Sequence, residues 1–186
     1  FWPDAKLSYQ ASAFYMRVED KLVARRVGPD SYIGLNAGAT THQGLELSVK
    51  GQNILGRRRA SYFPRIQPFV TYNYLNTRFE DFTDRGETYD GNRMPGTAPH
   101  FLKAGIRVIP YQQLRGNVHH KVSWRFRTEY RAAMPVNDEN SSKAASYQLF
   151  HTGLQYRLET GPLHLELSAR ARNLTDVLYA SMIVPN

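Results

Sequence analysis

The chain has 186 residues, and its 24 Lys and Arg against 16 Asp and Glu give a formal net charge of +8 at pH 7. This length fits one ordinary domain or part of a larger protein, and the absence of cysteine excludes a disulfide scaffold, a zinc–thiolate site and a cysteine nucleophile. Polar side chains interrupt every apolar run well before the roughly 20 residues of a transmembrane helix, whereas the alternating strands of a β-barrel stay possible.

The predicted elements are all strands. The first residues, Phe1 to Asp4, contain neither an initiator Met nor a signal sequence, so we expect a processed or excised piece. In chain order, the strand candidates are Lys6 to Glu19, Gly44 to Lys50, Arg65 to Phe79, Phe101 to Val108, Val118 to Tyr130, Ser146 to Leu158 and Leu163 to Arg172. Such runs predict an all-β fold, an antiparallel up-and-down meander of about seven long strands.

Alternation along the fifth and seventh segments separates two faces. Trp124 and Phe126 fall on one face, while Arg125 and Arg127 fall on the other, because successive strand residues point to opposite sides. Full charges in rows cannot lie in a sandwich core, so the charged face must contact water. Strands of about 10 to 14 residues are also long enough to cross a bilayer when tilted. The pattern favours a membrane barrel, with interfacial aromatics on its lipid face, over a soluble β-domain.

The connections between these strands alternate in length. Short links are predicted at Pro110 to Asn117 and Glu159 to Pro162, with a less short one at Gly51 to Pro64 on the same rim, and longer polar ones at Asp20 to Gly38, Glu80 to Pro99 and Ala132 to Ala145. Short turns on one rim and long loops on the other are typical of outer-membrane barrels, whose long loops are extracellular.

Four segments carry a resemblance to a known family. They are Ser12 to Asp20, Asn36 to Leu47, Gly91 to His100 and Ala171 to Tyr179, the last with the pattern Asn-Leu-x-Asp-x-x-Tyr. In this order they resemble the C-terminal part of the β-barrel of TonB-dependent outer-membrane receptors. The tail from Tyr179 to Asn186 is most similar to the ferric-siderophore and ferric-citrate branch.

The resemblance implies a 22-stranded transmembrane β-barrel, of which residues 1–186 are a C-terminal portion without the plug domain and the final strand. It implies a place in the bacterial outer membrane, with outer-membrane lipid, the rest of the barrel, the plug and, through the plug, the TonB complex as partners. The implied function is active transport of a ferric siderophore or other ferric chelate. The chelate is the transported ligand, so we expect no cofactor and no enzyme activity.

Candidate ligand contacts follow from charge. Ferric chelates are mostly anionic, and a lumen lined by basic side chains would focus positive potential on them. The strand residues in question are Lys103, Arg107, Lys121, Arg125, Arg127, Arg131, Arg170 and Arg172, and the loop residues near the expected mouth are Tyr89, Arg93 and His100. The alternative is that these arginines pair with Glu46, Glu129, Glu166 and plug carboxylates to fill the interior.

Other functions stay open beside transport. A self-contained small outer-membrane barrel could serve adhesion or ligand binding. A soluble basic β-domain could bind RNA or DNA, but the arginine rows lie opposite Trp124 and Phe126 and are not interleaved with them, so we expect no nucleic-acid partner. The six histidines show no metal-ligand spacing, and no Ser/His/Asp set for catalysis can be assembled.

Overall fold

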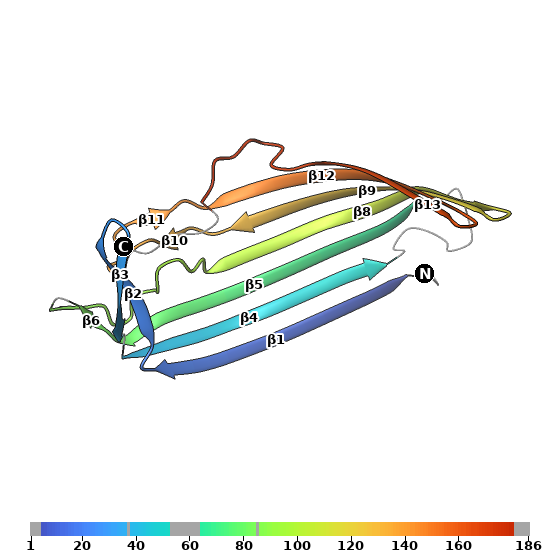
Figure 1. Ribbon diagram of the computed structural model, residues 1–186. Coiled ribbons are helices and arrows are strands. Elements are labelled where there is room, and N and C mark those ends of the chain that lie inside the picture. Colours follow the sequence, from blue (N-terminus) through green and yellow to red (C-terminus); the bar gives the residue numbers. More distant parts are fainter. Residues whose placement is uncertain (1–4, 37, 53–63, 85, 181–186) are drawn as a thin grey trace.

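The computed structural model describes residues 5–36, 38–52, 64–84 and 86–180, which form a broad curved sheet with small hairpins at one end (Figure 1). Within these ranges there is no helix, and so none that could span a membrane. The seven long strands are β1 (Lys6–Glu19), β4 (Ala39–Gln52), β5 (Arg65–Asp81), β8 (His100–Arg115), β9 (Val118–Arg131), β12 (Tyr147–Thr160) and β13 (Leu163–Ala171).

Neighbours along the chain are also neighbours in the sheet, whose order is β1-β4-β5-β8-β9-β12-β13. Every adjacent pair is antiparallel. Pairing is unbroken between β9 and β12, from Val118 opposite Thr160 to Arg131 opposite Tyr147. The predicted all-β meander of seven long strands is confirmed, while closure into a 22-stranded barrel stays a prediction.

Two predicted links are corrected by the length of the strands. β8 continues to Arg115, so the link predicted from Pro110 onward is only the turn of Gly116 and Asn117. A proline inside a strand usually costs a hydrogen bond to the neighbouring strand, because it has no backbone N–H. Pro110 avoids this cost because the register shifts between Val108 and Tyr111, and a residue in such a bulge need not donate. β4 extends through Gln52, and residues 53–63 of the other predicted link lie outside the described residues.

Long and short connections lie at opposite ends of the sheet, as predicted. At one end, here called the loop end, the long connections carry small hairpins that the sequence pattern did not predict (Figure 1). They pair β2 (Leu22–Gly28) with β3 (Ser31–Asn36), β6 (Thr83–Asp84) with β7 (Glu87–Thr88), and β10 (Met134–Pro135) with β11 (Lys143–Ala144). At the opposite turn end, Gly116 and Gly161 adopt φ of 58° and 52°, which tight turns require.

Buried apolar side chains gather at the loop end. Phe79 and Phe82 lie with ring centroids 4.6 Å apart and are 1% and 2% exposed. Val23, Tyr89 and Met94 pack against this pair. The middle of the sheet is different, because its apolar side chains stay open on one face, as with Leu154 at 53% exposure. The sheet therefore presents an apolar surface that the described residues do not cover.

Aromatic and histidine side chains mark both ends of that apolar face. Toward the loop end the Tyr72 hydroxyl lies 2.9 Å from His100 Nδ1, and toward the turn end His120 Nδ1 lies 2.8 Å from the Tyr156 hydroxyl. His120 and Tyr130 are separated along β9 by about 33 Å at 3.3 Å per residue. A strand tilt of 35–45° reduces that to a height of about 25 Å, which matches the apolar band of an outer-membrane barrel.

Candidate functional site: a basic hollow on the polar face

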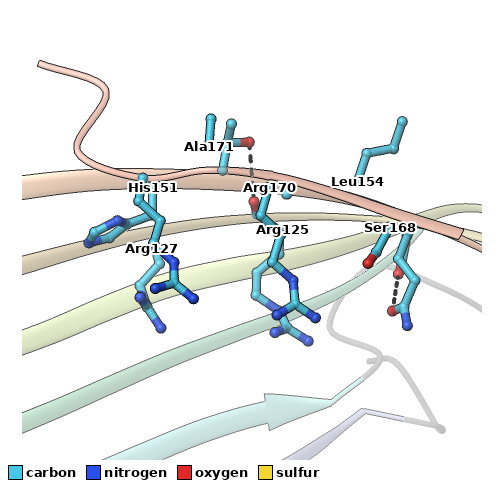
Figure 2. A pocket seen from close by; sticks show the side chains of 12 residues that line it. Arg125, Arg127, His151, Leu154, Ser168, Arg170 and Ala171 are labelled. Carbon is cyan, nitrogen blue, oxygen red and sulfur yellow. Dashed lines mark hydrogen bonds between the residues drawn. The ribbon is translucent and has the colours of Figure 1, made fainter.

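A hollow of about 170 Å³ lies on the polar face where β9, β12 and β13 run side by side. Figure 2 shows the side chains of Arg125, Arg127 and Arg170 on one side of the ribbon and that of Leu154 on the other. The basic hollow, as we call it, is lined by Ser123, Arg125, Arg127, His151, Thr152, Gly153, Leu154, Gln155, Ser168, Arg170, Ala171 and Arg172. Four of the predicted ligand contacts therefore meet at one place.

A glycine forms the floor between two of these arginines. Gly153 pairs with Arg125 of β9 on one side and with Arg170 of β13 on the other. A Cβ added there would come within 3.3 Å of Arg170 Cγ. Because Gly153 has no side chain, the two guanidinium groups flank an open space. The sequence analysis did not single out Gly153, although a glycine inside an alternating strand is a signal that could have indicated this position.

The charge of the basic hollow is only partly compensated. Glu129 accepts contacts from Arg127 Nε at 3.2 Å and from Lys103 Nζ at 3.5 Å. Within the described ranges, no carboxylate forms a salt bridge with Arg125, Arg170 or Arg172, although the charge of Glu166 acts on Arg170 at longer range. An uncompensated cluster of cations raises the local concentration of anions. The hollow is therefore suited to an anionic group supplied from outside these residues.

One arginine of the rows has the internal pairing that the alternative interpretation expected, whereas ligand contact by the others stays a prediction. Toward the turn end, Arg157 Nη2 donates to Glu166 Oε2 at 2.8 Å, which is the internal pairing that the alternative interpretation expected. Arg107 is held by neutral groups, since its Nη2 donates to Ser123 Oγ at 3.2 Å and to Gln155 Oε1 at 3.4 Å. Ser123 and Gln155 were not among the predicted site residues.

Arg131 lies nearer the loop end of the same face. Its guanidinium carbon lies 5.5 Å from the ring centroid of Phe101 and 6.0 Å from that of Tyr147. Such contacts hold a cation over aromatic faces. Arg131 therefore extends the basic row toward the loops but does not line the basic hollow.

The three predicted loop residues do not gather. Tyr89 packs against Phe82 and its hydroxyl donates to Glu139 at 3.4 Å, so burial and the Glu139 charge raise the pKa of Tyr89. Arg93 lines a separate hollow among the loops. His100 is the first residue of β8 rather than a loop residue, and it contacts Tyr72 and Tyr74 on the apolar face.

Two loops are tied together by one asparagine that sequence reasoning missed. Asn140, in the loop between β9 and β12, accepts from the Arg93 amide at 2.9 Å and donates to the Arg93 carbonyl at 2.8 Å. Nearby, Gly96 N donates to Pro135 O at 2.9 Å. Burial, helped by Glu139 and Asp84, raises the pKa of Asp138 to about 6. These three hydrogen bonds therefore connect the two loops at the loop end, and the acidic Asp138 lies beside them.

The Asn-Leu-x-Asp-x-x-Tyr pattern forms a turn docked on β12. The Asn173 side chain donates to Val177 O and accepts from Val177 N, both at 3.0 Å, and Asn173 has a φ of 51°. Leu174 N donates to Phe150 O at 2.9 Å. Asparagine suits this position because it tolerates the left-handed region and bonds to nearby backbone.

Within the described residues, no group of three or more His, Asp or Glu is placed to hold a metal ion. The chain was also compared with known families. The model of the family described as TonB dependent receptor-like, beta-barrel, matches residues 2–174.

Proposed function

Since the chain belongs to the TonB-dependent receptor β-barrel family, we propose that it forms part of the wall of a receptor that imports a ferric siderophore or another anionic ferric chelate. The family consists of transport receptors, not enzymes, of the Gram-negative outer membrane, which act together with a plug domain and TonB. The ferric-siderophore and ferric-citrate branch, and the ferric chelate as cargo, are part of the proposal.

The proposed setting is a 22-stranded barrel to which residues 1–186 contribute a C-terminal portion. β1 and β13 each have a partner on one side only within the described sheet. Inside a bilayer, backbone donors and acceptors on an open edge have no water to bond with, so both edges need further strands. Strands outside this sequence would supply them, and the plug would occupy the polar side.

The observation that carries the transport proposal is the uncompensated charge of the basic hollow. Arg125 and Arg170 flank Gly153 without a carboxylate partner among the described residues, whereas Arg157 on the same face is neutralised by Glu166. Guanidinium groups bind carboxylate and similar oxygens by charge-assisted hydrogen bonds. The carboxylates of a ferric citrate complex have this chemistry.

The experiment compares paired and unpaired arginines in the full-length receptor. We expect Arg125→Gln with Arg170→Gln to reduce the uptake of radiolabelled ferric citrate by iron-limited cells by about tenfold or more, given the strength of hydrogen bonds to charged groups. Arg157→Gln is the matched control, because it removes a charge that Glu166 already balances. A neutral ferric trihydroxamate serves as the second substrate.

Equal uptake of ferric citrate by the double variant and the wild type would show that the basic hollow does not act on the ligand. A matching loss for the neutral chelate would assign the arginines to the structure of the pore, since charge steering acts on anions. The amount of receptor in the outer membrane is measured in every case.

A further inference from the structure

A second basic hollow lies outside the lumen-facing set, among the loops. Its volume is about 320 Å³, the room of roughly ten waters at about 30 Å³ each. Three cations from three different segments line it: Arg78 near the end of β5, Arg93 in the following loop and Lys143 in β11. We call it the rim hollow.

The rim hollow opens on the apolar side of the sheet. Arg78 follows Tyr72 and Tyr74 at even spacing along β5, so all three side chains share one face. An isolated antiparallel β-bridge pairs the backbones of Arg93 and Arg78, so the two side chains share that face. Met94, the next residue, packs against the Phe79 and Phe82 cluster, as alternation requires.

Strand β5 also sets how far the rim hollow lies from the aromatic belt, by which we mean the tyrosine and histidine side chains at the loop end of the apolar face. Arg78 lies four residues beyond Tyr74, about 13 Å along β5. Tyr74 contacts His100, whose partner Tyr72 belongs to the belt at the loop end of the apolar face. Tyrosines of this kind sit at the headgroup level of a membrane. With a strand tilt of 35–45°, Arg78 lies about 10 Å above Tyr74 in height, on the outer side of that headgroup level. Arg93 and Lys143 line the same hollow beside it.

In the part of the chain that the structure describes, no carboxylate forms a salt bridge with Arg78, Arg93 or Lys143, although Asp138 and Glu139 lie in the same loop as Asn140. The Arg78 guanidinium donates to the Gly91 carbonyl, a neutral acceptor. Arg17, on the same face of β1, is different, because Glu80 lies 2.6 Å from its Nε and Glu19 contacts it as well. The chain thus neutralises one outward-facing arginine and leaves three outward-facing cations around an open space.

We propose that Arg78, Arg93 and Lys143 form a binding site for the phosphate groups of a lipid headgroup in the outer leaflet. Guanidinium and ammonium groups are the side chains that bind phosphate, and anionic lipids attract basic residues near the membrane surface. The loop connection through Asn140 holds Arg93 in place beside the β10–β11 hairpin that carries Lys143. This inference rests on the proposed membrane orientation but not on the identity of the transported ligand.

The test uses the full-length receptor in phosphatidylcholine nanodiscs that contain a minor fraction of phosphatidic acid, with native mass spectrometry of the retained lipid. We expect the wild type to retain phosphatidic acid and Arg93→Gln with Lys143→Gln to weaken that retention by about thirtyfold. This factor corresponds to about 2 kcal/mol, or about 1 kcal/mol for each basic side chain near an anionic membrane surface. Lys143→Gln alone, at an exposed position, should weaken it by about fivefold. Arg115→Gln, the same charge change at the turn end, is the matched control.

Three results would overturn the proposal. They are equal retention of phosphatidic acid and phosphatidylcholine by the wild type, equal losses for Arg115→Gln and Lys143→Gln, and displacement of bound phosphatidic acid by millimolar inorganic phosphate, which would indicate a site for free phosphate. Uptake of ferric citrate is measured in the same variants. If the rim-hollow variants lose lipid retention but keep normal uptake, the lipid site is separate from the proposed transport function. The complementary result is that Arg125→Gln with Arg170→Gln loses uptake but keeps lipid retention.

Discussion

The two faces of β12 at mid-height differ in the medium they are suited to. Leu154 is 53% exposed on a face that carries leucines, Trp124 and Phe126, while Gly153 and Gln155 on either side of it line the basic hollow. No second layer among the described residues covers the leucine. A single strand therefore has to meet an apolar medium on one side and water or a polar partner on the other. Its stability depends on its surroundings as much as on internal packing.

The sharpest way to break this comparison is to place one charge on each face. We expect Leu154→Arg to lower the free energy of unfolding in lipid by about 2–4 kcal/mol, the cost of Arg at the bilayer midplane of a barrel. Ser48→Arg, on the polar face of β4 between Glu46 and Lys50, should change it by less than about 0.5 kcal/mol. Urea titration of the full-length receptor in lipid vesicles measures both. Similar values for the two variants would contradict the assignment of Leu154 to lipid.

The polar face itself is not uniformly wet, and a glycine tests this. The Phe69 ring covers Gly105 so closely that an added Cβ would come within 2.6 Å of the ring and of Phe126 O. We expect Gly105→Ala to destabilise the sheet by about 1–3 kcal/mol through overpacking. Gly34→Ala is the matched control, since nothing lies within 4 Å of the added methyl group there. Thermal unfolding of both variants gives the comparison.

The strands could be predicted from the sequence because alternation is a local property. The range Lys6–Glu19 of β1 agrees with the prediction at both ends, since period-2 patterning continues to its last residue. The end of β8 was predicted too early because Pro110 normally ends a strand, and the bulge that accommodates it depends on the partner strand β9.

The site could be predicted only in part, for a related physical reason. Arg125 and Arg170 are distant in sequence and meet because both pair with Gly153, and the face each occupies follows from alternation alone. The loop residues obey no period, so the positions of Tyr89 and Arg93 depend on contacts such as that with Asn140. Asn140 itself has a φ of 58°, in the left-handed region, and a single residue of this kind leaves no periodic pattern in the sequence.

The two loops at the loop end, unlike the sheet, depend on single contacts, and Asn140 provides a direct test of one of them. We expect Asn140→Ala to lower the free energy of opening at the Arg93 amide by about 1–2 kcal/mol, because it removes the two hydrogen bonds to Arg93 and strains the backbone. Asn140→Gly keeps the left-handed conformation accessible and should lose only the hydrogen bonds. Hydrogen exchange of the full-length receptor measures both. Unchanged exchange at Arg93 would mean that the two loops are not coupled.

The smallest expected effect is the pH dependence of loop stability that comes from Asp138. The pKa of Asp138 is raised to about 6 by burial, Glu139 and Asp84, above the value of about 3.9 in an unfolded chain. Between about pH 6 and 4 the folded loop binds more protons than the unfolded one, so its stability rises as the pH falls through this window. Because Asp138 is only partly buried, screening limits the gain to less than about 1 kcal/mol.

Asp138→Asn should remove this pH dependence and stabilise the loop slightly at pH 7, because the neutral amide avoids the cost of burying a charge near Glu139. Hydrogen exchange at the Gly96 amide, which bonds to Pro135 O in the same pair of loops, reports the opening once intrinsic exchange rates at each pH are divided out. Glu87→Gln is the matched control, since Glu87 is an exposed acid in the β6–β7 hairpin. If Glu87→Gln removed the slope and Asp138→Asn kept it, the pH response would come from the hairpin and not from the contact between the two loops.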